Sequence, residues 1–162
     1  MVAIDMVIRD YDPADAKALM ELFHATVHAV CRSDYSPEQL SAWSPQSGQD
    51  VKRWKERFAT TRSFVAVGGD AALGFLELGR DGHIDCLYVR HDRQRQGIGS
   101  RLMDHAVAEA YRASLRRLDA EVSITAFAFF ERHGFVVTRA QEVECNGQRL
   151  KNFVMHRMLA AV

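Results

Sequence analysis

The sequence has few cysteines and no long hydrophobic run. Its three cysteines, Cys31, Cys86 and Cys145, lie far apart and never form a C-x-x-C pair, which argues against a disulfide framework or a zinc ribbon. No stretch of about 18 apolar residues occurs, and Asp5 interrupts the amino terminus before any apolar stretch of signal-peptide length. We therefore expect reduced thiols, no membrane partner and a cytoplasmic location.

The sequence also lacks an excess of charge of either sign. Lysine plus arginine and aspartate plus glutamate number 21 each, so the formal net charge at pH 7 is zero. This balance does not indicate a nucleic acid or an acidic membrane surface as a partner. Hydrophobic residues make up 48% of the chain, which is typical of a globular protein. At this length we expect residues 1–162 to form a single domain.

The hydrophobic pattern predicts an α/β protein. Apolar spacing indicates helices in the region 14–30, at 37–43 and 51–58, from 98 to 110, and at 125–133. Short apolar runs indicate strands at 6–8, 64–67, 72–78, 83–89, 118–122, 136–144 and 149–158. The three strands between 64 and 89 are separated by short glycine-containing turns, which favours an antiparallel meander. The strand, helix and strand between 83 and 122 favour a parallel pair within the sheet.

The stretch DRQRQGIGSRLM, residues 92–103, places two glycines between a predicted strand and a predicted helix. A dinucleotide-binding loop would need a third glycine where Leu102 stands, and no GK[ST] sequence of a Walker loop is present. What remains is Gln94 followed by Gly97 and Gly99. Glycines at such a turn let backbone N–H groups and the helix dipole approach an anion closely. The loop therefore predicts a pyrophosphate site.

Three segments together resemble the GNAT (GCN5-related) N-acetyltransferases: HIDCLYV, RHDRQRQGIGSRLM and SITAFAFFERHGF. The pairing of DYSPEQLSAW with the last of these also resembles the bacterial YafP-like subgroup. The resemblance implies a mixed, mostly antiparallel sheet flanked by helices, with a central splay that holds acetyl-CoA. It implies transfer of an acetyl group by direct attack of an amine, from a small molecule or a peptide, and it leaves a homodimer open.

The resemblance also implies which residues bind the cofactor. In GNAT proteins the backbone of the glycine loop cradles the pyrophosphate, and the strand before it pairs with the pantetheine arm. Carried over to this sequence, the loop residues are Gln94, Arg95, Gln96, Gly97, Ile98, Gly99 and Ser100, and the strand residues are Leu87, Tyr88 and Val89. Ser123, Phe129 and Phe130 are expected to lie along the same cofactor.

His83 and Asp85 are the candidates for handling the proton of the amine. Strand alternation places them on one face with Leu87 and Val89, and counting back from the loop, they match positions where several GNAT enzymes carry a basic Glu or His. An unperturbed imidazole titrates near pH 6.5, so His83 is the first choice as general base. Asp85 would orient His83, act through water or attract a cationic acceptor. The alternative is a solvated histidine at the start of a strand beside a salt-bridged aspartate.

Two positions depart from the common GNAT pattern. Phe130 stands where many members have a tyrosine that acts as general acid, and Ser123 stands where many have an asparagine that contacts the cofactor. A phenyl ring cannot donate a proton, so another tyrosine would have to serve. Tyr35, between the first predicted helices, is the substitute that we would test.

Two other kinds of function compete with catalysis. The phenylalanine at position 130 is compatible with a non-catalytic acyl-CoA-binding module. His24, His28 and Cys31 share one helical face, as in a metal-binding regulatory domain. No fourth ligand is evident for that metal site, and we expect no metal.

Overall fold

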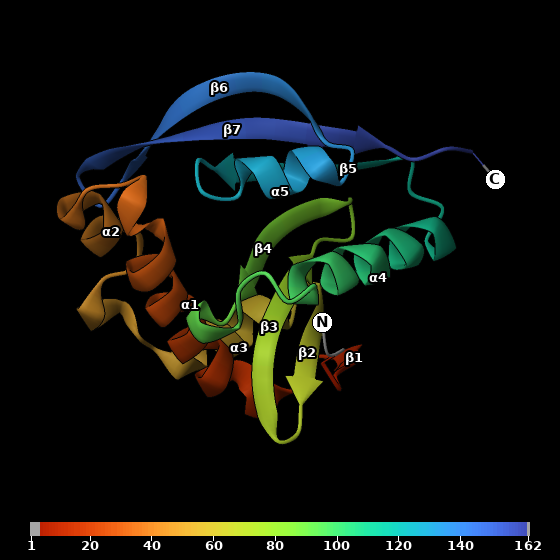
Figure 1. Ribbon diagram of the computed structural model, residues 1–162, viewed down its shortest axis with the longest axis horizontal. Coiled ribbons are helices and arrows are strands. Elements are labelled where there is room, and N and C mark those ends of the chain that lie inside the picture. The colour runs from red at the N-terminus through yellow and green to blue at the C-terminus, as the bar shows by residue number, and fades with distance from the viewer. Residues whose placement is uncertain (1–3, 162) are drawn as a thin grey trace.

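Within residues 4–161, which the computed structural model describes, seven strands form one mixed sheet (Figure 1). The order across the sheet is β1-β2-β3-β4-β5-β7-β6. The strands are β1 (Val7–Asp10), β2 (Arg62–Gly68), β3 (Ala71–Leu78), β4 (His83–Val89), β5 (Arg117–Ser123), β6 (Val136–Cys145) and β7 (Gln148–Met158). Only β4 and β5 pair in parallel, and the other neighbours are antiparallel. The α/β class and the mostly antiparallel sheet are thus confirmed.

Two of the helices within residues 4–161, α2 and α3, begin at a residue whose side chain caps the helix. The helices are α1 (Ala16–Val30), α2 (Pro37–Trp43), α3 (Val51–Phe58), α4 (Ile98–Arg112) and α5 (Phe127–Arg132). At α2 the Ser36 hydroxyl accepts from the Gln39 backbone N–H at 3.1 Å, and the Gln39 carboxamide oxygen accepts from the Ser36 N–H at 2.9 Å. This reciprocal cap, with Pro37 at the first helical position, fixes the start of the helix.

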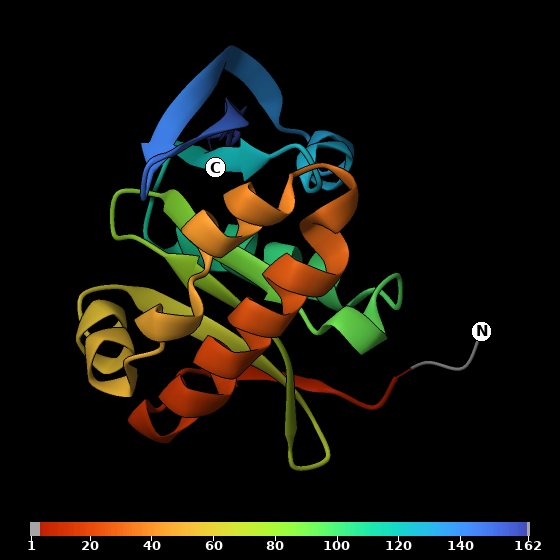
Figure 2. The same ribbon diagram turned by 90° about the vertical axis from the view of Figure 1, so that its left-hand side faces the viewer.

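The helices cover both faces of the sheet. Along β3, Leu76 packs with Leu102 of α4, whereas the preceding Phe75 packs with Leu19 of α1 and Trp54 of α3. This division follows from strand alternation, because successive side chains point to opposite faces. Figure 2 shows α1, α2 and α3 in front of the sheet and α4 behind it. Among the described residues, no helix is long and apolar enough to cross a membrane.

The sheet opens between β4 and β5. Their parallel ladder consists of two residue pairs, His83 with Asp119 and Ile84 with Ala120. Beyond Ile84 the two strands diverge, whereas β5 remains paired with β7 up to Ser123. The backbone of the second half of β4 therefore has no strand on its β5 side. This opening is the central splay that the sequence led us to expect.

A β-bulge at Asp85 changes the side-chain alternation of β4. Cys86 pairs with Glu77 of β3, but the next pair joins Ile84 to Leu78, so Asp85 is an extra residue on β4. Ile84 consequently packs on the α4 side of the sheet, whereas Cys86 packs on the α1 and α3 side. The prediction that strict alternation places His83 and Asp85 on one face with Leu87 and Val89 is therefore wrong. Ile84 shares the α4 side with Leu87 and Val89, and His83 points to the opposite side, toward Asp119. The bulge turns Asp85 toward α3.

Candidate active site

The glycine loop ends in a helix start with free backbone donors. Gly97 precedes α4 with a φ of +81°, a conformation that glycine adopts without steric cost. The first intrahelical bond runs from the Arg101 N–H to the Gly97 carbonyl at 3.1 Å. The N–H groups of Ile98, Gly99 and Ser100 therefore lie before this bond, at the positive end of the helix dipole. Three such donors suit a phosphate or pyrophosphate.

A cavity of about 530 Å³ lies along the splay. This volume is within the range of small-molecule sites, about 300–1,000 Å³. Several of the residues expected to bind the cofactor line it together: Leu87, Tyr88, Val89, Gln94, Arg95, Gly97, Ile98, Gly99, Ser100, Ser123, Phe129 and Phe130. Of the loop residues expected there, Gln96 does not line it. The opening between β4 and β5 thus brings the predicted cofactor residues to one place.

The backbone of β4 is partly used and partly free inside this cavity. The Val89 carbonyl accepts from the Thr26 hydroxyl of α1 at 3.1 Å and from the Gln94 carboxamide at 2.7 Å. Gln94 therefore closes the loop through its side chain. Leu87, two residues before Val89, directs its N–H and C=O to the same side of the strand, toward the opening. Within the described part of the chain, the Leu87 backbone forms no hydrogen bond beyond the strand ladder. It therefore offers a donor and an acceptor where an extended ligand would add as a strand.

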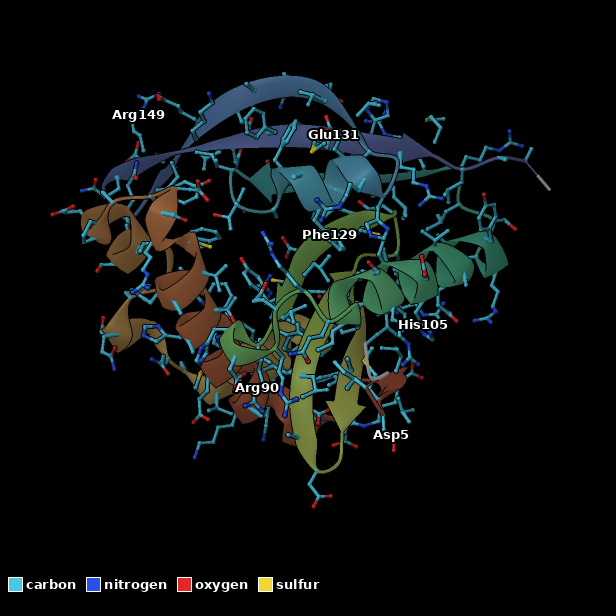
Figure 3. All side chains as sticks on the ribbon, in the orientation of Figure 1. Asp5, Arg90, His105, Phe129, Glu131 and Arg149 are labelled. Atoms are coloured by element: carbon cyan, nitrogen blue, oxygen red, sulfur yellow. The ribbon has the colours of Figure 1, made fainter. Side chains whose placement is uncertain are left out.

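The α5 helix borders the cavity with aromatic rings. Phe129 lies between α5 and the start of α4 (Figure 3), and a Cβ atom added at Gly99 would be 3.1 Å from its ring. Phe130 is buried and packs edge-on against Phe135, with ring centroids 5.0 Å apart. The Ser123 hydroxyl accepts from the Ala126 N–H at 3.1 Å and so closes the turn before α5. The structure thus gives Ser123 a local partner within the cavity wall.

His133 supports the helix start from outside the cavity lining. Its ring lies 4.4 Å from the Phe129 ring, measured between centroids, and its Nε2 is 3.1 Å from the Ser100 hydroxyl. Burial lowers the pKa of His133, and the nearby Asp104 carboxylate opposes this shift. We infer that at neutral pH His133 is an uncharged partner of Ser100.

Arg57 of α3 connects two carboxylates and a thiol. Its Nε donates to Glu77 at 2.8 Å, and its Nη2 donates to Asp85 and to the Cys86 sulfur at 2.9 Å each. Glu77 is almost fully buried, with 1% of the residue exposed, so this ion pair is needed to hold its charge. Burial raises the pKa of the Cys86 thiol well above its usual range, although Arg57 opposes the shift. Cys86 is therefore a neutral structural thiol.

His83 and Asp85 lie close together but have different surroundings. The His83 Nδ1 is 2.5 Å from an Asp119 oxygen on β5, and its Nε2 is 4.0 Å from Asp85. Asp85 lines the cavity, whereas His83 does not. His83 is about one-third exposed and sits at the closed end of the splay. Sequence reasoning missed Asp119, which becomes a neighbour of His83 only through the parallel pairing.

Tyr35 is a structural bridge, and its proposed role as general acid does not fit the structure. Its hydroxyl donates to the Lys151 carbonyl at 2.6 Å and accepts from the Ile124 N–H at 2.9 Å. The side chain is buried, with 6% of the residue exposed, and it does not line the cavity. Burial raises the pKa of this hydroxyl, although the bond from Ile124 opposes the shift. Tyr35 therefore links the α1–α2 connection to β5 and β7.

A second cavity of about 510 Å³ adjoins the first. It is lined from α1 and α3, from the segment 43–49 and from Asn146 in the turn between β6 and β7. Trp43 and Asp85 line both cavities, so the two spaces meet at these side chains. Arg57, which also lines the second cavity, was overlooked in the sequence. Helical spacing could have indicated Arg57, because it lies three residues after Trp54 and therefore on the same face of α3 as this buried side chain.

The two histidines of the metal hypothesis have protein partners. The His24 Nδ1 is 2.8 Å from the Ser44 hydroxyl, and the His28 Nε2 is 2.8 Å from the Ser44 carbonyl oxygen. Burial, followed by the charge of His28, lowers the pKa of His24. Residues 4–161 contain no cluster of three or more histidine, cysteine, aspartate or glutamate side chains arranged to hold a metal. His24 and His28 instead fix the end of α2.

Comparisons with known proteins agree with this geometry. Residues 31–157 match the family model described as an acetyltransferase (GNAT) domain. The chain is 36% identical over 148 residues to the uncharacterized N-acetyltransferase YafP of Escherichia coli (strain K12). The aligned region covers 91% of this chain and 93% of YafP. The likeness to YafP confirms the subgroup that the sequence indicated.

Solved structures of GNAT proteins share the whole fold. A GCN5-related N-acetyltransferase from Rhodopseudomonas palustris superposes with a TM-score of 0.91 at 31% identity, covering 98% of this chain and 99% of that one. The PaiA N-acetyltransferase of Thermoplasma acidophilum, solved in complex with coenzyme A, superposes with a TM-score of 0.79 at 17% identity. The superposition covers 96% of this chain and 100% of the PaiA chain. With the family match and the identity to YafP, these likenesses establish that this chain belongs to the GNAT family of N-acetyltransferases.

Proposed function

We propose that this protein transfers the acetyl group of acetyl-CoA to an amine by direct attack within the β4–β5 splay. One observation carries this proposal: the first cavity has free helix N–H groups at one end and Asp85 at the other, where the second cavity begins. A donor and an acceptor would thus meet at Asp85 without a covalent enzyme intermediate. Cys86, which would be the nearest nucleophile, is a buried neutral thiol.

The residues of the first cavity fit acetyl-CoA. The N–H groups of Ile98, Gly99 and Ser100 would hold the pyrophosphate, and Arg93 and Arg95, which also line the cavity, would add charge. The backbone of Leu87 would bind the pantetheine arm, and its N–H would serve as a donor to the thioester oxygen. Acetyl-CoA supplies an acyl group activated as a thioester. The PaiA structure with coenzyme A supports this choice of ligand.

The proton of the amine would leave through Asp85 and His83. Asp85 would hold the ammonium group of the acceptor at the junction of the two cavities. His83 Nδ1–H, bonded to Asp119, leaves the Nε2 lone pair facing Asp85 at 4.0 Å, a separation that one bridging water spans. Imidazole is better matched than a carboxylate to proton transfer near neutral pH. The partial exposure of His83 gives the proton a route to solvent.

The leaving thiolate would depart without a dedicated acid. Phe130 occupies the place of the usual tyrosine and is buried against Phe135. A thiol with a pKa of about 8.5 leaves far more readily than an alcohol would. The phenylalanine is therefore compatible with turnover.

Thiol release from acetyl-CoA, measured with a panel of amines, tests the proposal against a non-catalytic acyl-CoA-binding module. We expect amine-dependent release that falls about a hundredfold in Asp85→Asn, with coenzyme A affinity unchanged. Glu56→Gln, on the exposed surface of α3, is the matched control. Binding of acetyl-CoA without release on any amine would favour the binding module instead.

A further inference from the structure

The second cavity carries charges of both signs at separate places. Its charged lining residues are Arg53, Arg57 and Asp85. Arg57 already pairs with two carboxylates, Glu77 and Asp85, so this end of the cavity has one more negative than positive charge. Arg53 is exposed, and it takes part in none of the ion pairs found within the described part of the chain. The cavity therefore has an anionic end at Asp85 and a cationic end at Arg53.

Arg53 lies about one helical turn from Arg57, the partner of Asp85. Arg53 and Arg57 are four residues apart on α3 and share a face of the helix, with backbone positions about 6 Å apart along its axis. Arg57 reaches Asp85 at 2.9 Å. Asp85 and Arg53 both line the second cavity, so a small ligand bound there would lie between these two charges.

Aromatic side chains also line the second cavity. Phe23 of α1 and Trp54 of α3 lie with their ring centroids 5.3 Å apart, and Trp43 lines both this cavity and the first. His24 also lines the cavity, and burial together with His28 lowers its pKa. At neutral pH it therefore adds little positive charge. These aromatic side chains suit the packing of an aromatic ring of a ligand.

We propose that the second cavity binds an acceptor with three parts: an amine, an anionic group and an aromatic body, as in an aromatic amino acid. This inference rests on the proposed acetyl transfer, because it places the amine at Asp85 beside the thioester. The anionic group binds the Arg53 guanidinium, and the ring packs against Phe23 and Trp54. Two charge contacts of opposite sign fix the orientation of the acceptor, so that the amine rather than the acid faces the donor.

Tryptophan fluorescence tests the cavity directly, because the two tryptophans of the chain, Trp43 and Trp54, both line it. The probes are phenylalanine and phenylalaninamide, which share the amine and the ring but differ in the anionic group. We expect phenylalanine to change the fluorescence saturably and to bind at least about tenfold more tightly than the amide. Arg53→Gln should remove this preference by weakening phenylalanine alone. Lys52→Gln, an exposed neighbour on α3 that does not line the cavity, should preserve it.

Each other result overturns the inference. Equal affinity for phenylalanine and its amide would show that no anionic group is recognised, and an unchanged preference in Arg53→Gln would show that this arginine does not recognise it. The absence of a saturable signal with either probe would remove the site. The titration needs no turnover, so failure of the proposed acetyl transfer would appear separately, as phenylalanine binding without thiol release.

Discussion

The His83 imidazole on β4 bonds to the Asp119 carboxylate on β5 at 2.5 Å, across the first pair of the two-pair parallel ladder. The bond lies at the closed end of the splay, so it joins the two strands next to the place where they separate. It also fixes which ring nitrogen carries the proton. A histidine held in this way keeps its Nε2 toward Asp85.

Removal of the His83 ring tests its role in proton transfer. We expect His83→Ala to lower amine acetylation about a hundredfold at neutral pH, because a general base contributes about 10²–10⁴ in rate. Affinity for coenzyme A, measured by calorimetry, should stay within about twofold of the unaltered protein. The site is partly exposed, so added imidazole should restore part of the lost rate. An unaltered rate would exclude the assignment.

Asp119 should act through His83 rather than on the substrate. Asp119→Asn keeps the size of the side chain but allows the opposite imidazole tautomer, with the Nε2 protonated. We expect a loss of rate of about tenfold or more, with no further loss when it is combined with His83→Ala. Additive losses in the double variant, measured by thiol release, would show that the two residues act independently.

A side chain at Gly99 should interfere with cofactor binding before it affects chemistry. A Cβ atom there would lie 3.1 Å from Phe129 and 3.6 Å from the Val89 side chain. Gly99→Val must therefore displace the wall of the cavity, and we expect coenzyme A affinity to fall at least about tenfold. Gly99→Ala should weaken coenzyme A binding for the same reason, and adding Phe129→Leu to it should restore the affinity if the Phe129 ring is the obstacle. Normal coenzyme A binding by Gly99→Val would contradict this reading of the loop.

Local sequence signals predicted most of the elements well. The β4 strand has both of its predicted ends, His83 and Val89. In the structure Gly82, with a φ of +94°, precedes the strand, and a 3-10 turn follows it. The α5 helix was predicted two residues too early, since the Ser123 hydroxyl first closes a turn with the Ala126 N–H. Caps and turns depend on residues that are close together in the sequence, so they can be predicted from it.

The arrangement of the site depended on contacts that the sequence does not mark. Strand alternation predicted that Asp85 shares a face of β4 with Leu87 and Val89. In the structure, a single bulge against β3 directs its side chain toward Arg57 instead. The ladder ends after Ile84, and this ending decides both the splay and the pairing of His83 with Asp119. These features depend on register between distant strands. The glycine motif and the resemblance to GNAT proteins therefore indicated which residues line the first cavity, whereas the pairing of His83 with Asp119 could be seen only in the structure.

Tyr35 should matter for stability more than for catalysis. Tyr35→Phe removes the acceptor for the N–H of the half-buried Ile124 and the donor to the Lys151 carbonyl. We expect the free energy of unfolding, measured with urea, to fall by about 1–3 kcal/mol. Because the Tyr35 hydroxyl does not line the first cavity, the rate of acetyl transfer by the folded variant should stay within about twofold of that of the unaltered protein. A large loss of rate with unchanged stability would restore Tyr35 as a candidate acid.

The Arg9–Asp15 pair should make stability depend on pH in the acid range. Arg9 donates to both Asp15 oxygens, at 2.7 and 2.8 Å, and this bonding lowers the pKa of Asp15, although burial opposes it. A pKa lower in the folded than in the unfolded state adds stability that is complete above about pH 4 and disappears as the pH falls through the folded value. Asp15→Asn, which keeps an acceptor for the Asp12 N–H, should therefore lower the free energy of unfolding at pH 7 by about 1 kcal/mol. At pH 2 the two proteins should differ little in urea unfolding, and an equal difference at both pH values would contradict the ionic origin.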